Sequence, residues 1–191
     1  MKLCFATNNA HKLEEIQDLL GDSFSLTTLR EIGCEEEIPE THDTIPENSF
    51  EKAEYVWKNY GINCFADDSG LEVDALNGAP GVHSAYYGGP ERDADVNMDL
   101  LLKNLEGHSN LAARFICIIT LVIEGKYRQF EGTIEGSISL EKRGSHGFGY
   151  NPIFIPEGHS RTFAEMTMQE KSELSHRGRA FEKLKQYLLN L

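Results

Sequence analysis

Two adjacent carboxylates, Asp67 and Asp68, follow the short apolar run 64–66 and precede the pair Ser69–Gly70. The apolar run predicts a buried strand, and Ser-Gly predicts a turn in which the chain reverses. Carboxylates at the end of a strand can bind a hard cation through their oxygens. Because neighbouring side chains in a strand point to opposite faces, we expect only one of the two to face a given cleft. The alternative is an ordinary solvated turn, since Asp, Ser and Gly are common turn residues.

A second candidate segment follows the predicted strand 2–6 and opens a predicted helix, whose apolar residues recur at helical spacing until Gly21. The segment consists of Thr7, Asn8, Asn9, Ala10, His11 and Lys12. Asn9 or a neighbour is the expected N-cap, and the unpaired N–H groups of a helix N-terminus attract anions. Lys12 in the first turn is unfavourable beside the helix dipole unless an anion joins it. The alternative is a capped helix with a solvated lysine. The sequence contains no GxxxxGK[ST] motif, which excludes a P-loop.

Two further segments lie in the C-terminal part of the chain. Glycines flank Phe148, which leaves the face of its ring uncovered by neighbouring side chains and makes it a candidate for stacking on a base. An ordinary aromatic turn is the alternative. A basic cluster in an acidic protein suggests an anion pocket, with a solvated basic helix face as the alternative. Its members are Lys171, His176, Arg177 and Arg179.

The rest of the pattern mixes strands and helices, as in an α/β protein. Further strands are predicted at 25–29, 112–123 and 126–140, further helices at 44–60, 93–105 and 175–191, and long loops at 31–43 and 75–89. Two capping boxes, Thr44 with Glu47 and Thr167 with Glu170, predict helix starts. The two long strands are joined at Glu124–Gly125 and should form a hairpin.

Composition narrows the classes of protein that fit. The chain has 191 residues, of which 40% are hydrophobic, and a formal net charge of −13. This charge argues against general binding to nucleic acid or anionic membranes, which need a basic field. The four cysteines are widely spaced without a CxxC pair, so neither a disulfide framework nor a zinc site is predicted. No apolar run is long enough to span a bilayer, and we expect a cytoplasmic protein.

Taken in order, the motifs closely resemble those of the inosine triphosphate pyrophosphatase family. The matching segments are 7–12, 67–71, 148–152 and 175–177, and the segment 77–86 is similar to the family's GGAPGxxSARY stretch. The resemblance extends from residue 3 to about residue 188. It implies a single domain, 1–191, with a long twisted mixed sheet, helices at both ends, two lobes and a central substrate cleft. It also implies a homodimer.

The resemblance further implies Mg²⁺-dependent hydrolysis of ITP, dITP and XTP to the monophosphate and pyrophosphate. Asp68 would be the general base and a metal ligand, and Glu40 would be a second ligand. The implied substrate-binding residues are Thr7, Asn8, Asn9, Ala10, His11, Lys12, Ser69, Phe148, Gly149, Tyr150, Asn151, Lys171, His176 and Arg177. A donor such as Arg177 would favour a 6-oxo purine over adenine, which presents an amino donor at that position.

This sequence departs from the family at Asn151, where the family usually has Asp. An amide both donates and accepts hydrogen bonds, so we hypothesise a relative preference for xanthosine, whose 2-oxo group needs a donor. Three alternatives stay open. They are a pyrophosphatase for other modified or standard nucleotides, a catalytically silent nucleotide-binding protein, and an RNA-binding module using Phe148, which the net charge disfavours.

Overall fold

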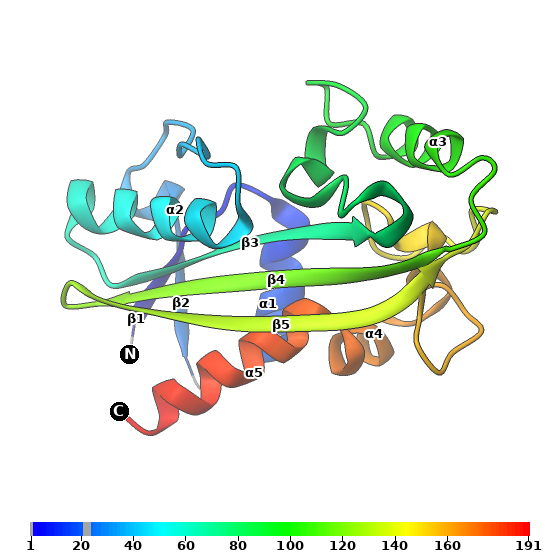
Figure 1. The fold of residues 1–191 in the computed structure, drawn as a ribbon. Helices are drawn as coiled ribbons and strands as arrows, with labels where there is room; N and C mark the ends of the chain where they lie inside the picture. The colour runs from blue at the N-terminus through cyan, green and yellow to red at the C-terminus, as the bar shows by residue number, and fades with distance from the viewer. Residues whose placement is uncertain (1, 21–23) are drawn as a thin grey trace. The chain divides into compact units, whose positions relative to one another are not determined.

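The computed structural model describes residues 2–20 and 24–191, so the helix end predicted at Gly21 lies outside the described residues. The fold is built on a six-stranded sheet with the order β2-β1-β3-β4-β5-β6 (Figure 1). The strands are β1 (Lys2–Phe5), β2 (Ser25–Thr28), β3 (Cys64–Val73), β4 (Ala112–Ile123), β5 (Lys126–Ile138) and β6 (Phe154–Pro156). Strands β2 and β3 run parallel to β1, whereas β6 runs antiparallel to β5. The predicted α/β fold with a mixed sheet is therefore confirmed.

The α-helices are α1 (Ala10–Leu20), α2 (Ile45–Tyr60), α3 (Ala94–Asn104), α4 (Met168–Leu174) and α5 (His176–Leu189). Both predicted capping boxes lie at helix starts, because the side chain of Thr44 accepts from the Glu47 N–H and that of Thr167 from the Glu170 N–H. None of the helices in the described part of the chain is long and apolar enough to cross a membrane.

The chain divides into two compact units, each built from several segments. The first comprises Met1–Asp68, Cys117–Gly132 and Arg177–Leu191, and the second comprises Ser69–Ile116 and Thr133–His176. Strands β3, β4 and β5 contribute residues to both units. Each unit has its own buried hydrophobic side chains.

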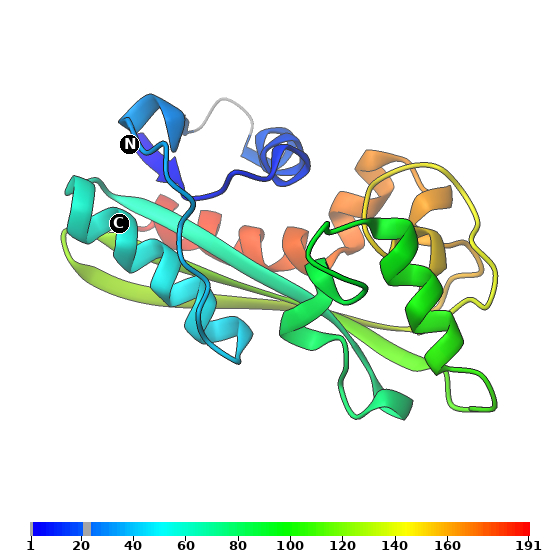
Figure 2. The same cartoon turned by 90° about the horizontal axis from the view of Figure 1, so that it is seen from above.

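In the first unit, alternation along the strands sends side chains to two separate cores. Phe65 of β3 packs in one core with residues of α1 and α5, including Ile16 and Phe181. Ala66, the next residue, packs in the other core with Ala53 and further residues of α2. Figures 1 and 2 accordingly show α2 on one side of the strands and α5 on the other.

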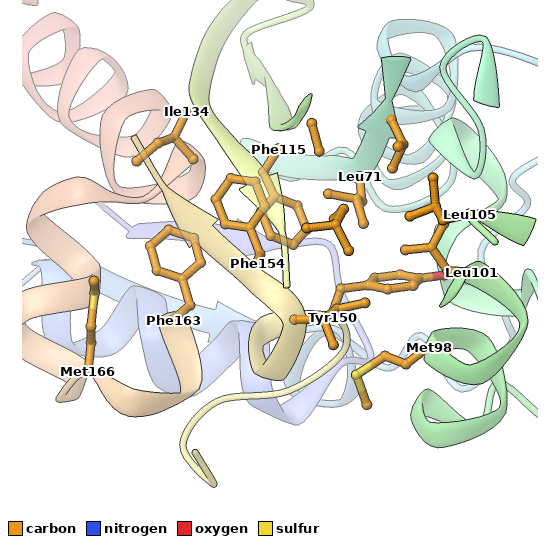
Figure 3. Close-up of a cluster of buried hydrophobic side chains, with 14 residues drawn as sticks. Leu71, Met98, Leu101, Leu105, Phe115, Ile134, Tyr150, Phe154, Phe163 and Met166 are labelled. Carbon is orange, nitrogen blue, oxygen red and sulfur yellow. The ribbon is translucent and has the colours of Figure 1, made fainter. Parts of the chain in front are cut away.

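In the second unit, aromatic side chains from β4, β6 and the following segment form the centre of the core (Figure 3). The rings of Phe115 and Phe154 meet edge to face at 4.6 Å between centroids, and Phe163 lies against both. Gly136 of β5 makes this packing possible, since a Cβ there would lie 2.3 Å from the carbonyl oxygen of Ile155. The backbone of β6 therefore approaches β5 closely at Gly136.

The hairpin between β4 and β5 has the geometry that a two-residue connection requires. Glu124 and Gly125 have φ values of 49° and 75°, as in a type I′ turn.

One expectation was wrong: Ser69–Gly70 is not a turn, because β3 continues through both residues to Val73. The long neighbouring strand β4 continues the sheet beside it, and Gly70 is buried without a positive φ. The predicted loop 75–89 overlaps the short 3-10 helix Asp74–Leu76 and contains a second one, Gly81–Tyr86.

Candidate active site

The first group of candidate residues surrounds the N-terminus of α1. The side-chain oxygen of Asn9 accepts hydrogen bonds from the N–H groups of His11 (3.0 Å) and Lys12 (3.3 Å), which confirms Asn9 as the N-cap. The Thr7 hydroxyl oxygen accepts from the Asn9 N–H at 3.2 Å and fixes the preceding turn. Residues 8–11 are exposed. The segment therefore presents a capped helix N-terminus, the backbone feature that favours anion binding.

Lys12 has a counter-ion within the first unit. Its Nζ lies 3.0 Å from each carboxylate oxygen of Asp67, a side chain that is only 2% exposed. The same carboxylate accepts a hydrogen bond from Nε of Arg177 at 3.3 Å. Nη1 of Arg177 in turn donates to Glu15 of α1, and both of these side chains are buried. One carboxylate of β3 thus binds cations from α1 and α5.

The protonation of Asp67 follows from these contacts. Burial alone would raise its pKa, but the positive charges of Lys12 and Arg177 outweigh burial and hold the pKa well below its usual range. Asp67 is therefore ionised at neutral pH. This is the anion that a lysine in the first turn of α1 requires.

Asp68 contacts different partners on the other face of β3. Nζ of Lys52, from α2, lies 3.6 Å from the Asp68 carboxylate and also forms an ion pair with Glu40. Burial raises the pKa of Asp68, and the charges of Lys52 and Lys12 offset only part of that rise. A carboxylate with a raised pKa is a better proton acceptor than a fully solvated one. The two adjacent acids therefore occupy distinct environments, as strand alternation predicts.

The carboxylates of Asp68 and Glu40 share one ammonium group, so a cation between them is already part of the structure. Within 2–20 and 24–191, no three His, Cys, Asp or Glu side chains form a group that could hold a metal ion. Mg²⁺ in nucleotide sites commonly uses only one or two protein carboxylates, together with substrate phosphates and water. The oxygen donors of this pair fit that requirement.

A second group of candidate residues lies in the second unit. Nζ of Lys171, a buried side chain, lies 5.3 Å from the centre of the Phe148 ring. Asn151 is 4% exposed, and its amide nitrogen packs against Gly147, where a Cβ would lie only 2.1 Å away. The same Cβ would lie 3.4 Å from Nζ of Lys171. A half-buried aromatic ring and two side-chain donors therefore meet around Gly147.

Other predicted site residues of the second unit have structural contacts. The imidazole of His176 stacks on Phe115 at 4.7 Å, and the Tyr150 hydroxyl donates to the backbone oxygen of Ser84 at 2.8 Å. Ser69 lies half-buried within β3, and Gly149 has a φ of 61°. Their predicted contacts with substrate stay predictions.

Two charged residues of the first unit were missed by the sequence analysis: Glu15 and Lys52. Asp67 was named there only as one of a pair, without a role of its own. A signal for Lys52 was present, because it falls between Ser49, Ala53 and Val56 on the buried face of α2. A lysine at such a position needs a carboxylate partner. Glu15 and Arg177 are separated by 162 positions, and no local pattern connects them.

Positioned cations and carboxylates are the groups by which enzymes neutralise charge and orient the reactants in phosphoryl transfer. The family model described as the Ham1 family matches residues 3–187. The chain belongs to this family, which confirms the resemblance drawn from the motifs. A protein of Porphyromonas gingivalis named dITP/XTP pyrophosphatase is 52% identical over 190 residues, covering 98% of this chain and 97% of that protein. One of the same name from Flavobacterium johnsoniae is 51% identical over 184 residues, covering 96% of each.

Solved structures agree with this assignment. A HAM1 protein from Coxiella burnetii has a TM-score of 0.93 and 38% identity, with all of both chains covered. A nucleoside-triphosphatase, or dITP/XTP pyrophosphatase, from Mycobacterium abscessus has a TM-score of 0.79 and 42% identity over 96% of this chain and 98% of that one.

Proposed function

We propose that this protein hydrolyses deaminated, non-standard purine nucleoside triphosphates (ITP, dITP and XTP) to the monophosphate and pyrophosphate. The observation that carries the proposal is identity of about half of all positions, over nearly the whole chain, to proteins named dITP/XTP pyrophosphatase. The charged groups on β3 agree with it. Hydrolysis of a triphosphate needs charge neutralisation and a positioned water rather than a covalent nucleophile.

Asp68 is the proposed general base, which accepts the proton of the attacking water. Burial, which raises the pKa of Asp68, supports this role, and the Lys52 ammonium 3.6 Å away would hold the carboxylate in place. Asp68 and Glu40 would hold Mg²⁺. A magnesium ion bound there would supply positive charge to the phosphate oxygens.

The N-terminus of α1 is the proposed binding site for the triphosphate. Thr7, Asn9 and Lys12 would hold it, together with the N–H groups of residues 8–12. The capped, exposed start of the helix and its positive dipole end support this role. Lys12, whose ammonium group lies 3.0 Å from the Asp67 carboxylate, would add a hydrogen-bond donor for a phosphate oxygen.

The second unit supplies the proposed base recognition. Phe148 would stack on the purine, and Lys171 and His176 would bind phosphate or the 6-oxo edge of the base. Arg177, which belongs to the first unit, is proposed for the same kind of contact. The lysine beside the Phe148 ring supports this assignment, because an ammonium donor favours an oxo group over the amino group of adenine.

We also propose that the protein forms a homodimer and is located in the cytoplasm. Light scattering on the purified protein tests the first, and fractionation of cells that express a tagged chain tests the second.

Release of pyrophosphate and of free phosphate should be measured with ITP, XTP, ATP and GTP in the presence of magnesium. We expect rapid pyrophosphate release from ITP and XTP and loss of that release in Asp68→Asn. Equal rates with all four would assign the chain to pyrophosphatases of broader base range. Absence of release from all of them would refute the proposed hydrolysis.

A further inference from the structure

We propose that Asp67 is a positioning residue, which fixes Lys12 of α1 and Arg177 of α5 on one face of β3 while Asp68 acts on the other. The inference rests on the proposed function, because it concerns how the triphosphate-binding lysine is held. It assigns separate tasks to two carboxylates that are neighbours in the sequence.

The alternation of side chains along β3 determines which partners each acid can reach. Phe65 and Asp67 share a face, and the Phe65 ring lies 6.2 Å from the Phe181 ring of α5. Asp67 therefore points into the layer that contains α1 and α5. Asp68 shares its face with Ala66, which packs in the core on the side of α2. Neither acid can replace the other without a change of face.

The contacts of Asp67 join three elements of the first unit. Both of its carboxylate oxygens lie 3.0 Å from Nζ of Lys12, and one accepts from Nε of Arg177 at 3.3 Å. Arg177 continues the chain of charges to Glu15, one helical turn after Lys12 on α1. The side chains of Asp67, Arg177 and Glu15 are all at least 94% buried. These buried ion pairs leave Lys12 little conformational freedom.

Stability alone does not account for these buried charges. A buried ion pair is often no more stabilising than apolar side chains of similar volume, and the neighbouring residue Phe65 on this face packs in an apolar core. The lysine ammonium, by contrast, is at the end of a flexible four-carbon chain and beside a helix N-terminus that repels it. Asp67 supplies the attraction that keeps Nζ at this position. The positioned ammonium is then ready to meet a phosphate without a further loss of side-chain entropy.

A double-mutant cycle on kcat/KM for ITP tests this role, with Asp67→Asn, Lys12→Met and the double variant. Asp67→Asn is expected to lower kcat/KM about 10- to 100-fold, as for loss of a hydrogen bond to a charged group. In the Lys12→Met background the same change should cost at least about threefold less than in the wild type, because only Arg177 is then left for Asp67 to position. Equal losses in both backgrounds would overturn the inference. Asp74→Asn, an exposed acid just after β3, is the matched control for loss of one charge.

If Asp67→Asn does not fold, Asp67→Glu is the variant to test. It keeps the buried negative charge but moves the carboxylate by one methylene group. A kcat/KM about tenfold below wild type, with an unchanged melting temperature, supports positioning. Full activity of Asp67→Glu would refute it. The same double-mutant cycle can be measured without turnover, from the affinity of each variant for inorganic tripolyphosphate in a calorimeter. If the wild type releases no pyrophosphate, the proposed function fails, whereas the coupling between residues 12 and 67 in tripolyphosphate binding still supports or refutes the positioning role.

Discussion

Replacing Asn151 by Asp tests base recognition through a change of only one side-chain group. Asn151 is buried, and its Nδ2 has no hydrogen-bond acceptor in the part of the chain that the structure describes. The nitrogen packs against Gly147 close to Lys171, next to the ring of Phe148. A buried N–H donor that lacks an acceptor costs about 1–3 kcal/mol. A purine with an oxygen at position 2 would supply that acceptor, which xanthine has and hypoxanthine lacks.

The size of the effect follows from this single contact. An ionised carboxylate in place of the Asn151 amide would only accept hydrogen bonds, so the 2-oxo group of XTP would face another acceptor. ITP carries no oxygen at this position and should be much less affected. We therefore expect the ratio of kcat/KM for XTP to that for ITP to fall by about 1–3 kcal/mol, or about 5- to 150-fold, in Asn151→Asp.

The assay is steady-state pyrophosphate release from XTP and ITP by the same enzyme preparation, so that the active fraction cancels in the ratio. Asn151→Ala is the matched control, because it removes the donor without adding a charge and should lower the ratio in the same direction. A ratio in Asn151→Asp that stays within about twofold of the wild-type ratio, or that rises, would refute the reasoning.

Three further predictions concern the metal site and the two residue groups. Lys52→Met leaves the Asp68 and Glu40 carboxylates without their shared cation. It should lower the free energy of unfolding, measured by urea titration, by about 3 kcal/mol. An unchanged free energy would mean that the two carboxylates are already solvated. Gly147→Ala places a methyl group 2.1 Å from the Asn151 amide nitrogen, at a residue whose φ is 77°. KM for ITP should therefore rise about tenfold. An unchanged KM would show that Gly147 does not shape the base-binding site. Removal of divalent cations with EDTA should abolish pyrophosphate release and added Mg²⁺ should restore it, and activity that persists in EDTA would contradict the proposed metal dependence.

Local signals in the sequence predicted the elements well. The capping boxes at Thr44 and Thr167 predicted the starts of α2 and α4, and Glu124–Gly125 predicted the hairpin. The Ser69–Gly70 turn was wrong because turn propensity is local, whereas the continuation of β3 depends on a partner strand, β4, that is distant in the sequence.

The candidate site could be predicted only in part for the same reason. The motifs identified Lys12, Asp68 and Arg177, and strand alternation predicted that the two acids face different sides. The partners of these residues did not follow from any pattern. The Glu15–Arg177 contact brings together positions near the two ends of the chain, and only the folded sheet places them side by side.

The opposite orientation of Asp67 and Asp68 also restricts how this gene can change. Insertion or deletion of one codon between β1 and Asp67 that shifted the register of β3 would turn each carboxylate to the other face and exchange their partners. Lys12 and Lys52 would then each meet the wrong acid. Insertions and deletions that shift the register of β3 should therefore be removed by selection, even where the inserted or deleted amino acids are themselves acceptable.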